Sequence, residues 1–387
     1  MGSPQHPSWL LAVDFGTSNT AAAYVSPESG RLMTLPLSHS GNLMPSAAFV
    51  SAPNQIEVGE VALNRAASDP SGYLSAPKRL ITLGETVFRV GDWDIPAHHV
   101  VAAVLHSVLL RVKAQNRGQA PAGLVLTHPE GWSPQQIAVL TQAAGVVGYP
   151  AHTVTVVSEP QAAVHFYARG RAGAVGGHVA VFDFGGGTLD IAVLSSPSAG
   201  SFRVLGTHGD NALGGRNFDT AIRRWVDVVL DDRNPDLAAA LLNAAAFHEL
   251  RGLEESVRRA KELLSEAPSA TVEVTVGGRR EVLSLTRNEF EALILHDVER
   301  GVELARNVFR TARVAENIRE IYLTGGSSRI PLVHKHVQAL GAIATLDDPK
   351  TVVAQGALVA VARRMVGGSG PAAHYPATAT PRPAPAP

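Results

Sequence analysis

The chain lacks several residue types and patterns, and each absence excludes a class of protein. None of its 387 residues is cysteine, which excludes disulfide scaffolds, thiolate zinc sites and cysteine nucleophiles. It has no run of 18 uncharged apolar residues, and the first residues, MGSPQHPSW, lack the basic and apolar regions of a secretion signal. A GxxxxGK[ST] motif is also missing, which excludes a P-loop nucleotide site. These absences predict a soluble, cytoplasmic protein with no transmembrane segment.

The charges are balanced. Lysine and arginine total 33 and aspartate and glutamate 34, for a net charge of −1, so no chain-wide footprint for a nucleic-acid partner is expected. Apolar residues make up 45% and charged residues 17%, which is typical of a folded protein. A chain of 387 residues exceeds what one hydrophobic core usually serves, which predicts two lobes.

Strand-like and helix-like segments alternate, which predicts an α/β protein with mixed sheets. Short apolar runs predict strands at 9–15, 20–25, 123–127 and 153–157, and alternation around Gly277-Gly278 predicts a hairpin at 271–285. Helices are predicted at 98–113, from Ser133 onward, and through 237–265, before Pro268. From Gly367 the chain is rich in Pro, Ala, Gly and Thr, which predicts a disordered tail.

One internal repeat stands out. LLAVDFGTSNTAAAYV at 10–25 and HVAVFDFGGGTLDIAVL at 178–194 each place Asp-Phe-Gly and a Gly/Thr/Ser turn between two apolar strands. Asp14 and Asp183 are 169 residues apart, about one domain length, so the repeat predicts two similar lobes that face each other.

The two turns have the composition of anion-binding loops. Their backbone N–H groups, hydroxyls and glycines suit phosphate oxygens, whereas the adjacent aspartates suit a hydrated Mg²⁺. An ordinary β-hairpin explains either motif alone; two copies at domain spacing favour a shared phosphate site. IYLTGGSSRIP at 321–331 and VVSEPQAAV at 156–164 are weaker signals, since a plain strand–turn–helix explains the first and a helix N-cap at Glu159 the second.

Together these segments resemble the nucleotide-binding domain of the DnaK-type heat-shock protein 70 chaperones, within the actin-like ATPase superfamily. The matching pieces are AVDFGTSNT, MPSAAFV, APKRLI, SEPQAAV, VFDFGGGTLD, ALGGRNFD, RRAKELLS and LTGGSSRIP, in the family's order across 9–366. The resemblance implies an actin-like ATPase fold of two duplicated lobes, each a mixed β-sheet flanked by helices, with a nucleotide cleft between them. The implied division is 9–172 plus 348–366 for lobe I and 173–347 for lobe II, with an upper subdomain at about 223–300 and a tail at 367–387.

The resemblance also implies roles for particular residues, with ATP or ADP and Mg²⁺ as ligands. The catalytic positions would be Lys78, Glu159, Asp183 and Thr188. Asp14 and Asp183 would hold the Mg²⁺, largely through water, with Asp190 as a further candidate. The nucleotide-binding positions would be Gly16, Thr17, Ser18, Asn19, Gly185, Gly186, Gly187, Gly214, Gly215, Arg258, Lys261, Glu262, Ser265, Gly325, Gly326, Ser327 and Arg329. Lys78 is one of only five lysines, and a solvated surface lysine is the alternative without the family match.

The sequence departs from the family pattern at several places, including Lys350-Thr351, where the family has an Asp-Glu pair. Glu262 replaces one of two arginines that sandwich the adenine, which leaves Arg329 and predicts several-fold weaker nucleotide binding unless Arg258 substitutes. Ile137 replaces an arginine that relays nucleotide state to the outside of lobe I. The family's linker and peptide-binding domain are not recognisable after Met365.

The expected function is that of a chaperone-like domain that binds ATP and hydrolyses it slowly, and whose lobe closure signals to partners such as a co-chaperone or exchange factor. Two alternatives stay open: a nucleotide-binding regulatory switch with negligible ATPase activity, and a filament-forming bacterial actin relative.

Overall fold

A computed structural model describes residues 9–366 apart from residue 40 and the segments 169–176, 199–200, 244–246, 315–317 and 345–350. The predicted tail at 367–387 and the predicted lobe boundaries at 172/173 and 347/348 lie outside the described residues.

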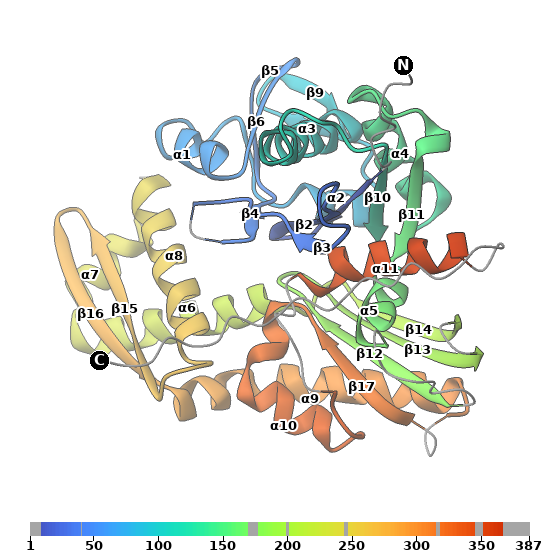
Figure 1. Cartoon of the computed structure of the whole chain (residues 1–387). Helices are drawn as coiled ribbons and strands as arrows, with labels where there is room; N and C mark the ends of the chain where they lie inside the picture. The colour runs from blue at the N-terminus through green and yellow to red at the C-terminus, as the bar shows by residue number, and fades with distance from the viewer. Residues whose placement is uncertain are drawn as a thin grey trace, which may run out of the picture.

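Two mixed sheets organise the chain (Figure 1). The sheet of lobe I has the order β11-β10-β1-β2-β3, with β4 paired to β2; that of lobe II has the order β14-β13-β12-β17. The lobe I strands are β1 (Leu10–Phe15), β2 (Asn19–Val25), β3 (Leu32–Thr34), β4 (Leu43–Pro45), β10 (Gly123–His128) and β11 (Val154–Ser158). The lobe II strands are β12 (His178–Phe184), β13 (Leu189–Ser198), β14 (Ser201–Asp210) and β17 (Ile318–Thr324).

The two sheets repeat one plan, as the sequence predicts. β1 pairs antiparallel with β2 and parallel with β10, and β12 pairs antiparallel with β13 and parallel with β17. The same hydrogen bond closes both hairpin turns: Gly16 N donates to Asn19 O at 3.1 Å, and Gly185 N donates to Thr188 O at 2.9 Å. The fold class predicted from the repeat is confirmed.

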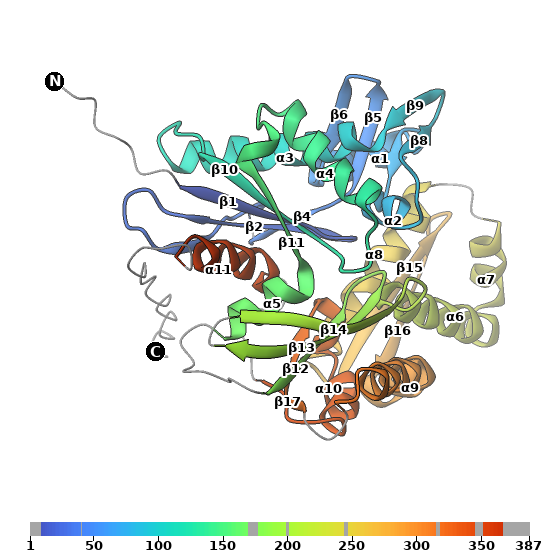
Figure 2. The same cartoon turned by 90° about the vertical axis from the view of Figure 1, so that its right-hand side faces the viewer.

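Two helices lie between the sheets, α5 (Glu159–Tyr167) and α11 (Val352–Val366) (Figure 2). α11 buries small apolar side chains against the lobe I sheet, including Ala354 and Ala357 against Ala12. α5 buries Val164 and its neighbours against the lobe II sheet. The two helices therefore join the lobes through closely packed small side chains.

Lobe I carries two further small sheets and four more helices. The strands are β5 (Ala48–Ala52), β6 (Gln55–Val58), β7 (Tyr73–Leu74), β8 (Val87–Val90) and β9 (Trp93–Pro96), and the helices α1 (Glu60–Ser68), α2 (Pro77–Thr82), α3 (Ala97–Gln115) and α4 (Pro134–Val146). The helix predicted at 98–113 is α3, whose apolar stripe is buried. The one predicted from Ser133 is α4, and Ser133 forms a capping box with Gln136 at its start.

Lobe II surrounds its sheet with helices and extends outward as a helical layer with a hairpin. These elements are α6 (Gly215–Arg233), α7 (Pro235–Leu242), α8 (Phe247–Leu263), β15 (Ser269–Val276), β16 (Arg279–Thr286), α9 (Arg287–Thr311), a 3₁₀ turn (Gly326–Arg329) and α10 (Pro331–Gln338). The predicted hairpin is confirmed as β15–β16. The stretch predicted as helical at 237–265 is divided between α7 and α8, whose ends at 242 and 247 flank segment 244–246.

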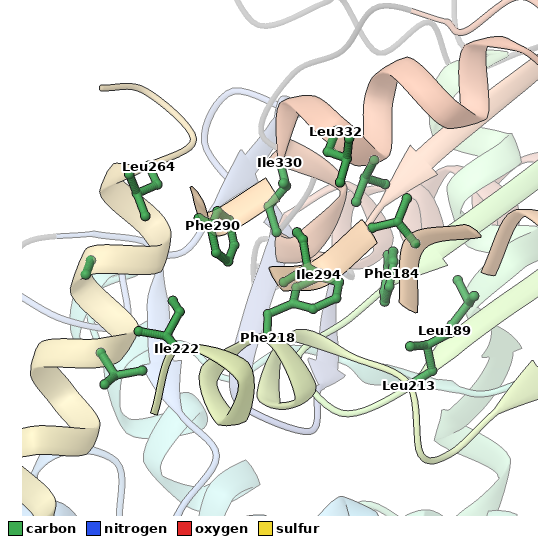
Figure 3. Packing of buried hydrophobic residues seen from close by; sticks show 14 of the residues in the cluster. Phe184, Leu189, Leu213, Phe218, Ile222, Leu264, Phe290, Ile294, Ile330 and Leu332 are labelled. Carbon is green, nitrogen blue, oxygen red and sulfur yellow. The ribbon is translucent and has the colours of Figure 1, made fainter. Parts of the chain in front are cut away.

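Aromatic packing fixes α6 against the end of β12. Phe184 follows Asp183, and its ring meets that of Phe218 edge to face with centroids 5.3 Å apart (Figure 3). Both rings are fully buried. This contact holds the first turn of α6 beside the glycine loop that follows Phe184.

Candidate active site

A cleft of about 1750 Å³ opens between the two lobes. It is lined by residues from β1, β2, α2, α5, β12, α6, α8 and the turn after β17. Most of the residues predicted to bind nucleotide or metal line it: Asp14, Gly16, Thr17, Ser18, Asn19, Lys78, Glu159, Asp183, Gly185, Gly186, Thr188, Asp190, Arg258, Lys261, Glu262, Ser265, Gly325, Gly326, Ser327 and Arg329. Segments that are far apart in the sequence thus converge on one cavity.

The two repeated glycine loops touch each other across the cleft. A Cβ atom on Gly186 would lie 2.3 Å from Ser18 Oγ, and one on Gly187 would lie 2.8 Å from Thr17 Cγ2. These separations are shorter than any real contact, so only glycine allows the loops to approach this closely. Loop residues from opposite lobes therefore form the base of the cleft together.

Lys78 is buried at the base and paired with a carboxylate. Its Nζ donates to Glu159 Oε1 at 2.5 Å, and the two side chains are only 5% and 11% exposed. The same Nζ lies 5.9 Å from the ring centroid of Trp132. The alternative of a solvated surface lysine is wrong for Lys78.

Three aspartates crowd the same base. Burial raises the pKa of Asp14 to about 6, although Lys78 opposes the shift and Thr127 Oγ1 donates to its carboxylate at 2.8 Å. Burial and the charges of Glu159, Asp190 and Asp14 raise the pKa of Asp183 well above its usual value. Burial also raises the pKa of Asp190, against a hydrogen bond from Thr188. Negative charge at the base therefore exceeds what one lysine compensates.

Three further glycines predicted to bind nucleotide, Gly187, Gly214 and Gly215, pack closely at the junction of the second glycine loop and α6. A Cβ atom on Gly214 would lie 2.6 Å from the Gly187 carbonyl carbon. Gly215 N donates to Gly185 O at 3.0 Å, so α6 begins directly behind the loop. Gly214 and Gly215 therefore pack the start of α6 against the second glycine loop, and their assignment to nucleotide binding stays a prediction.

The turn after β17 joins the same site. Gly325 has φ of +78°, and a Cβ atom there would lie 2.5 Å from Asp183 Oδ1, so the position requires glycine on both counts. Ser327 Oγ donates to Gly185 O at 2.9 Å. These contacts hold the turn against the second glycine loop.

α8 forms the outer wall of the cleft. Two nitrogens of the Arg258 guanidinium donate to the Glu255 carboxylate at 2.8 Å and 3.1 Å. Arg258 is therefore already paired and does not take the place of the arginine that Glu262 replaces. Lys261 Nζ lies 2.7 Å from Asp219 Oδ1 and 3.1 Å from Gly215 O. Ile137, the second departure, is half-buried against the lobe I core.

Glu159 lies one position later relative to α5 than the sequence predicts, and two residues that contact the site were not identified from the sequence. Ser158 rather than Glu159 precedes α5, and Glu159 occupies the first helical position, where it faces Lys78 instead of capping the helix. Thr127 and Asp219 were not predicted. Thr127 could have been found, since β10 runs parallel to β1 and brings its carboxyl end to Asp14; Asp219 carries no comparable signal.

These features define the class of the protein: an actin-like ATPase fold with its site between two duplicated lobes. A family model described as "Hsp70 protein" matches residues 84–367. The chain is 32% identical to chaperone protein HscA of Serratia proteamaculans and 34% identical to an HscA homolog of Pseudomonas putida. Both matches cover 92% of this chain and 58% of the relative. The chain belongs to the Hsp70 family.

The chain spans about 58% of the length of the curated relatives it matches. Among the residues described here, no helix is long and apolar enough to span a membrane. The same residues include no group of three or more histidine, aspartate or glutamate side chains placed to ligate a metal directly.

Proposed function

We propose that this chain binds ATP in the interlobe cleft, hydrolyses it slowly to ADP and phosphate, and signals the bound state through the angle between its lobes. A co-chaperone or exchange factor is the expected reader of that angle. The proposal rests on one observation: two loops with the same turn, from opposite lobes, meet beside a buried lysine and a group of carboxylates.

The phosphates are assigned to the base of the cleft. Backbone N–H groups of the two loops and the hydroxyls of Thr17, Ser18 and Thr188 are suited to phosphate oxygens. Lys78 supplies a compact positive charge close to the γ-phosphate, and Glu159, held by Lys78, orients the attacking water. The water attacks the γ-phosphorus, the bond to the bridging oxygen of ADP breaks, and the water's proton passes to a carboxylate at the base.

The donor set fits a hydrated Mg²⁺. Burial raises the pKa values of Asp14, Asp183 and Asp190, and repulsion from neighbouring carboxylates adds to the shift at Asp14 and Asp183, so a further cation would stabilise their charged forms. Mg²⁺ keeps several of its waters in protein sites, so these aspartates would hold the ion largely through water. When bound, Mg²⁺ would neutralise charge on the phosphate chain.

The nucleoside is assigned to the outer part of the cleft, between α8 and the turn after β17. Lys261, Ser265 and Arg329 line this part. Because Glu262 faces the cleft where the family has an arginine, and Arg258 is paired with Glu255, we expect weaker binding of the base than two flanking arginines would give.

The test is to measure binding and turnover separately. Thr188→Val and Lys78→Ala should retain ATP binding in isothermal titration and lose phosphate release. Lys335→Ala, on the exposed face of α10, is the control and should keep both. Phosphate release that is unchanged in Thr188→Val and Lys78→Ala would reject the assignment.

A regulatory switch with negligible hydrolysis is the second candidate. The half-buried Ile137, in place of the relay arginine, favours it because the usual route from the nucleotide to the lobe surface is altered. A single-turnover assay separates the two candidates: ADP forms within the bound complex only if the chain is an ATPase.

A further inference from the structure

Five of the basic side chains on the α6 and α8 wall of the cleft have a carboxylate partner. The pairs are Arg223 with Asp227 at 3.0 Å, Arg251 with Glu254 at 2.9 Å, Arg258 and Arg259 with Glu255 at 2.8 and 2.9 Å, and Lys261 with Asp219 at 2.7 Å. The wall is therefore built with its positive charges compensated.

Arg216 is the exception. It lies in the first turn of α6 and lines the cleft, and its backbone N donates to Gly186 O at 2.8 Å, which places the residue beside the second glycine loop. Within the described part of the chain, its half-buried guanidinium makes no hydrogen bond or ion pair. A partly desolvated guanidinium without an anionic partner is costly.

Among the described residues no neighbour forms an ion pair with Arg216, although Tyr73, Asp219 and Glu254 oppose the lowering of its pKa. Burial lowers the pKa of Arg216, and the charge of Arg79 on α2 of lobe I lowers it further, so two guanidinium groups from opposite lobes repel each other. The nearby carboxylates, Asp219 and Glu254, are held by Lys261 and Arg251. Tyr73, the other neighbour from lobe I, has the guanidinium of Arg251 over its ring at 5.5 Å.

We propose that Arg216 binds a phosphate group inside the cleft, as an anion site additional to the glycine loops and Lys78. The planar guanidinium fork matches two phosphate oxygens, and Arg216 lines the cleft with its backbone bonded to the second glycine loop. The phosphate is either a free ion or part of a bound nucleotide; only the second source rests on the function proposed above. A phosphate at this point also offsets the repulsion between Arg79 and Arg216 and so favours closure of the lobes.

The first experiment uses inorganic phosphate as the probe, with the full chain and the ionic strength matched by sodium chloride. Isothermal titration and thermal shift are measured for wild type, Arg216→Gln and Arg223→Gln, a control whose arginine is already paired. Phosphate stabilises folded proteins in general, so the difference between the two variants is the readout. Arg216→Gln should weaken phosphate binding about tenfold or abolish it, the effect of one lost charge-assisted hydrogen bond.

Arg216→Glu adds a second, independent measurement. It places a carboxylate opposite Arg79, so the nucleotide-free variant should be more thermostable than Arg216→Gln and insensitive to phosphate. Because it restores charge compensation, a stable Arg216→Glu also separates loss of the site from failure to fold. Phosphate binding to Arg216→Glu as tight as to wild type would overturn the proposal.

The second experiment compares ATP, ADP and adenosine, and it separates the sources. If the group belongs to the nucleotide, Arg216→Gln weakens ATP or ADP binding about tenfold and leaves adenosine unchanged. If wild type binds ATP and Arg216→Gln alters neither phosphate nor nucleotide binding, the Arg216 site is refuted and the proposed function stands. If wild type binds phosphate but no nucleotide, and Arg216→Gln no longer binds phosphate, the proposed function fails and the phosphate site stands.

Discussion

Replacing Lys78 by methionine tests the electrostatics of the cleft base most directly. The lysine is 4% exposed and Glu159 is 9% exposed, and their contact is 2.5 Å long. Methionine keeps most of the side-chain volume and removes the charge. Three buried carboxylates, Asp14, Glu159 and Asp183, then face one another without the lysine that compensates them.

The expected loss of stability is large. Removing one partner of a buried ion pair costs about 3–5 kcal/mol, because the remaining charge stays desolvated. For one lobe of this protein that loss corresponds to a fall in melting temperature on the order of 10 °C. Arg65→Met is the matched control: Arg65 pairs with Glu57 at 2.8 Å, but the side chains are 53% and 35% exposed, and such a pair contributes about 1 kcal/mol or less.

The pH dependence of stability is a sharper criterion. It is measured by thermal unfolding, with EDTA present so that no metal ion binds the carboxylates. Burial raises the pKa of Asp14 to about 6, so the folded state binds the proton more tightly, and stability falls as the pH rises from about 4 to 6. Lys78 lowers the pKa values of Asp14 and Asp183, so Lys78→Met raises both. The variant should therefore lose more stability at pH 8 than at pH 5. Equal loss at both pH values, or none, would refute the reasoning.

Three further predictions follow from single contacts. Gly356→Ala should cost about 1–3 kcal/mol or more in urea unfolding, since its Cβ would lie 1.9 Å from a backbone oxygen of α5. Gly145→Ala, on α4 where no atom lies near the added Cβ, should stabilise the protein by up to about 1 kcal/mol. Equal changes in stability for the two variants would contradict this prediction. Arg251→Ala removes the contact with Tyr73 across the cleft and should speed release of fluorescent ADP about two- to fivefold in stopped flow; an unchanged rate would count against it. Thr286→Ala removes a capping box and should cost about 1 kcal/mol in urea unfolding; no measurable loss would contradict the capping role.

Much of the fold could be predicted from the sequence because local chemistry and global architecture agree. The Asp-Phe-Gly turns require glycine beside a strand end, and that pattern occurs twice at domain spacing. The structure forms the same hairpin at both places, with equivalent closing hydrogen bonds at Gly16 and Gly185. The strand at 123–127 was predicted from a short apolar run, and the hairpin at 271–285 from alternating apolar residues on either side of Gly277-Gly278.

Parts of the site could not be predicted because they depend on tertiary packing. A glycine motif does not show which backbone lies against the glycine, so the close packing of Gly214 on Gly187 and of α6 on the second glycine loop could not be predicted. The sequence also does not show which charges pair: Arg216 and Arg223 lie seven positions apart on one helix, yet among the described residues only Arg223 of the two forms an ion pair.

If the cleft closes on a ligand as proposed, its charges would couple binding to closure in two places and with opposite signs. At the base, Asp14 lies near the end of a strand of lobe I and Asp183 near the end of a strand of lobe II, and the charge of Asp14 adds to the raised pKa of Asp183. Nearer α6, Arg79 from lobe I and Arg216 from lobe II repel each other. Closing the lobes strengthens both repulsions, because Coulomb energies grow as charges approach. A cation offsets the first repulsion and a phosphate the second, so a metal–nucleotide complex is suited to both, whereas neither ion alone offsets more than one.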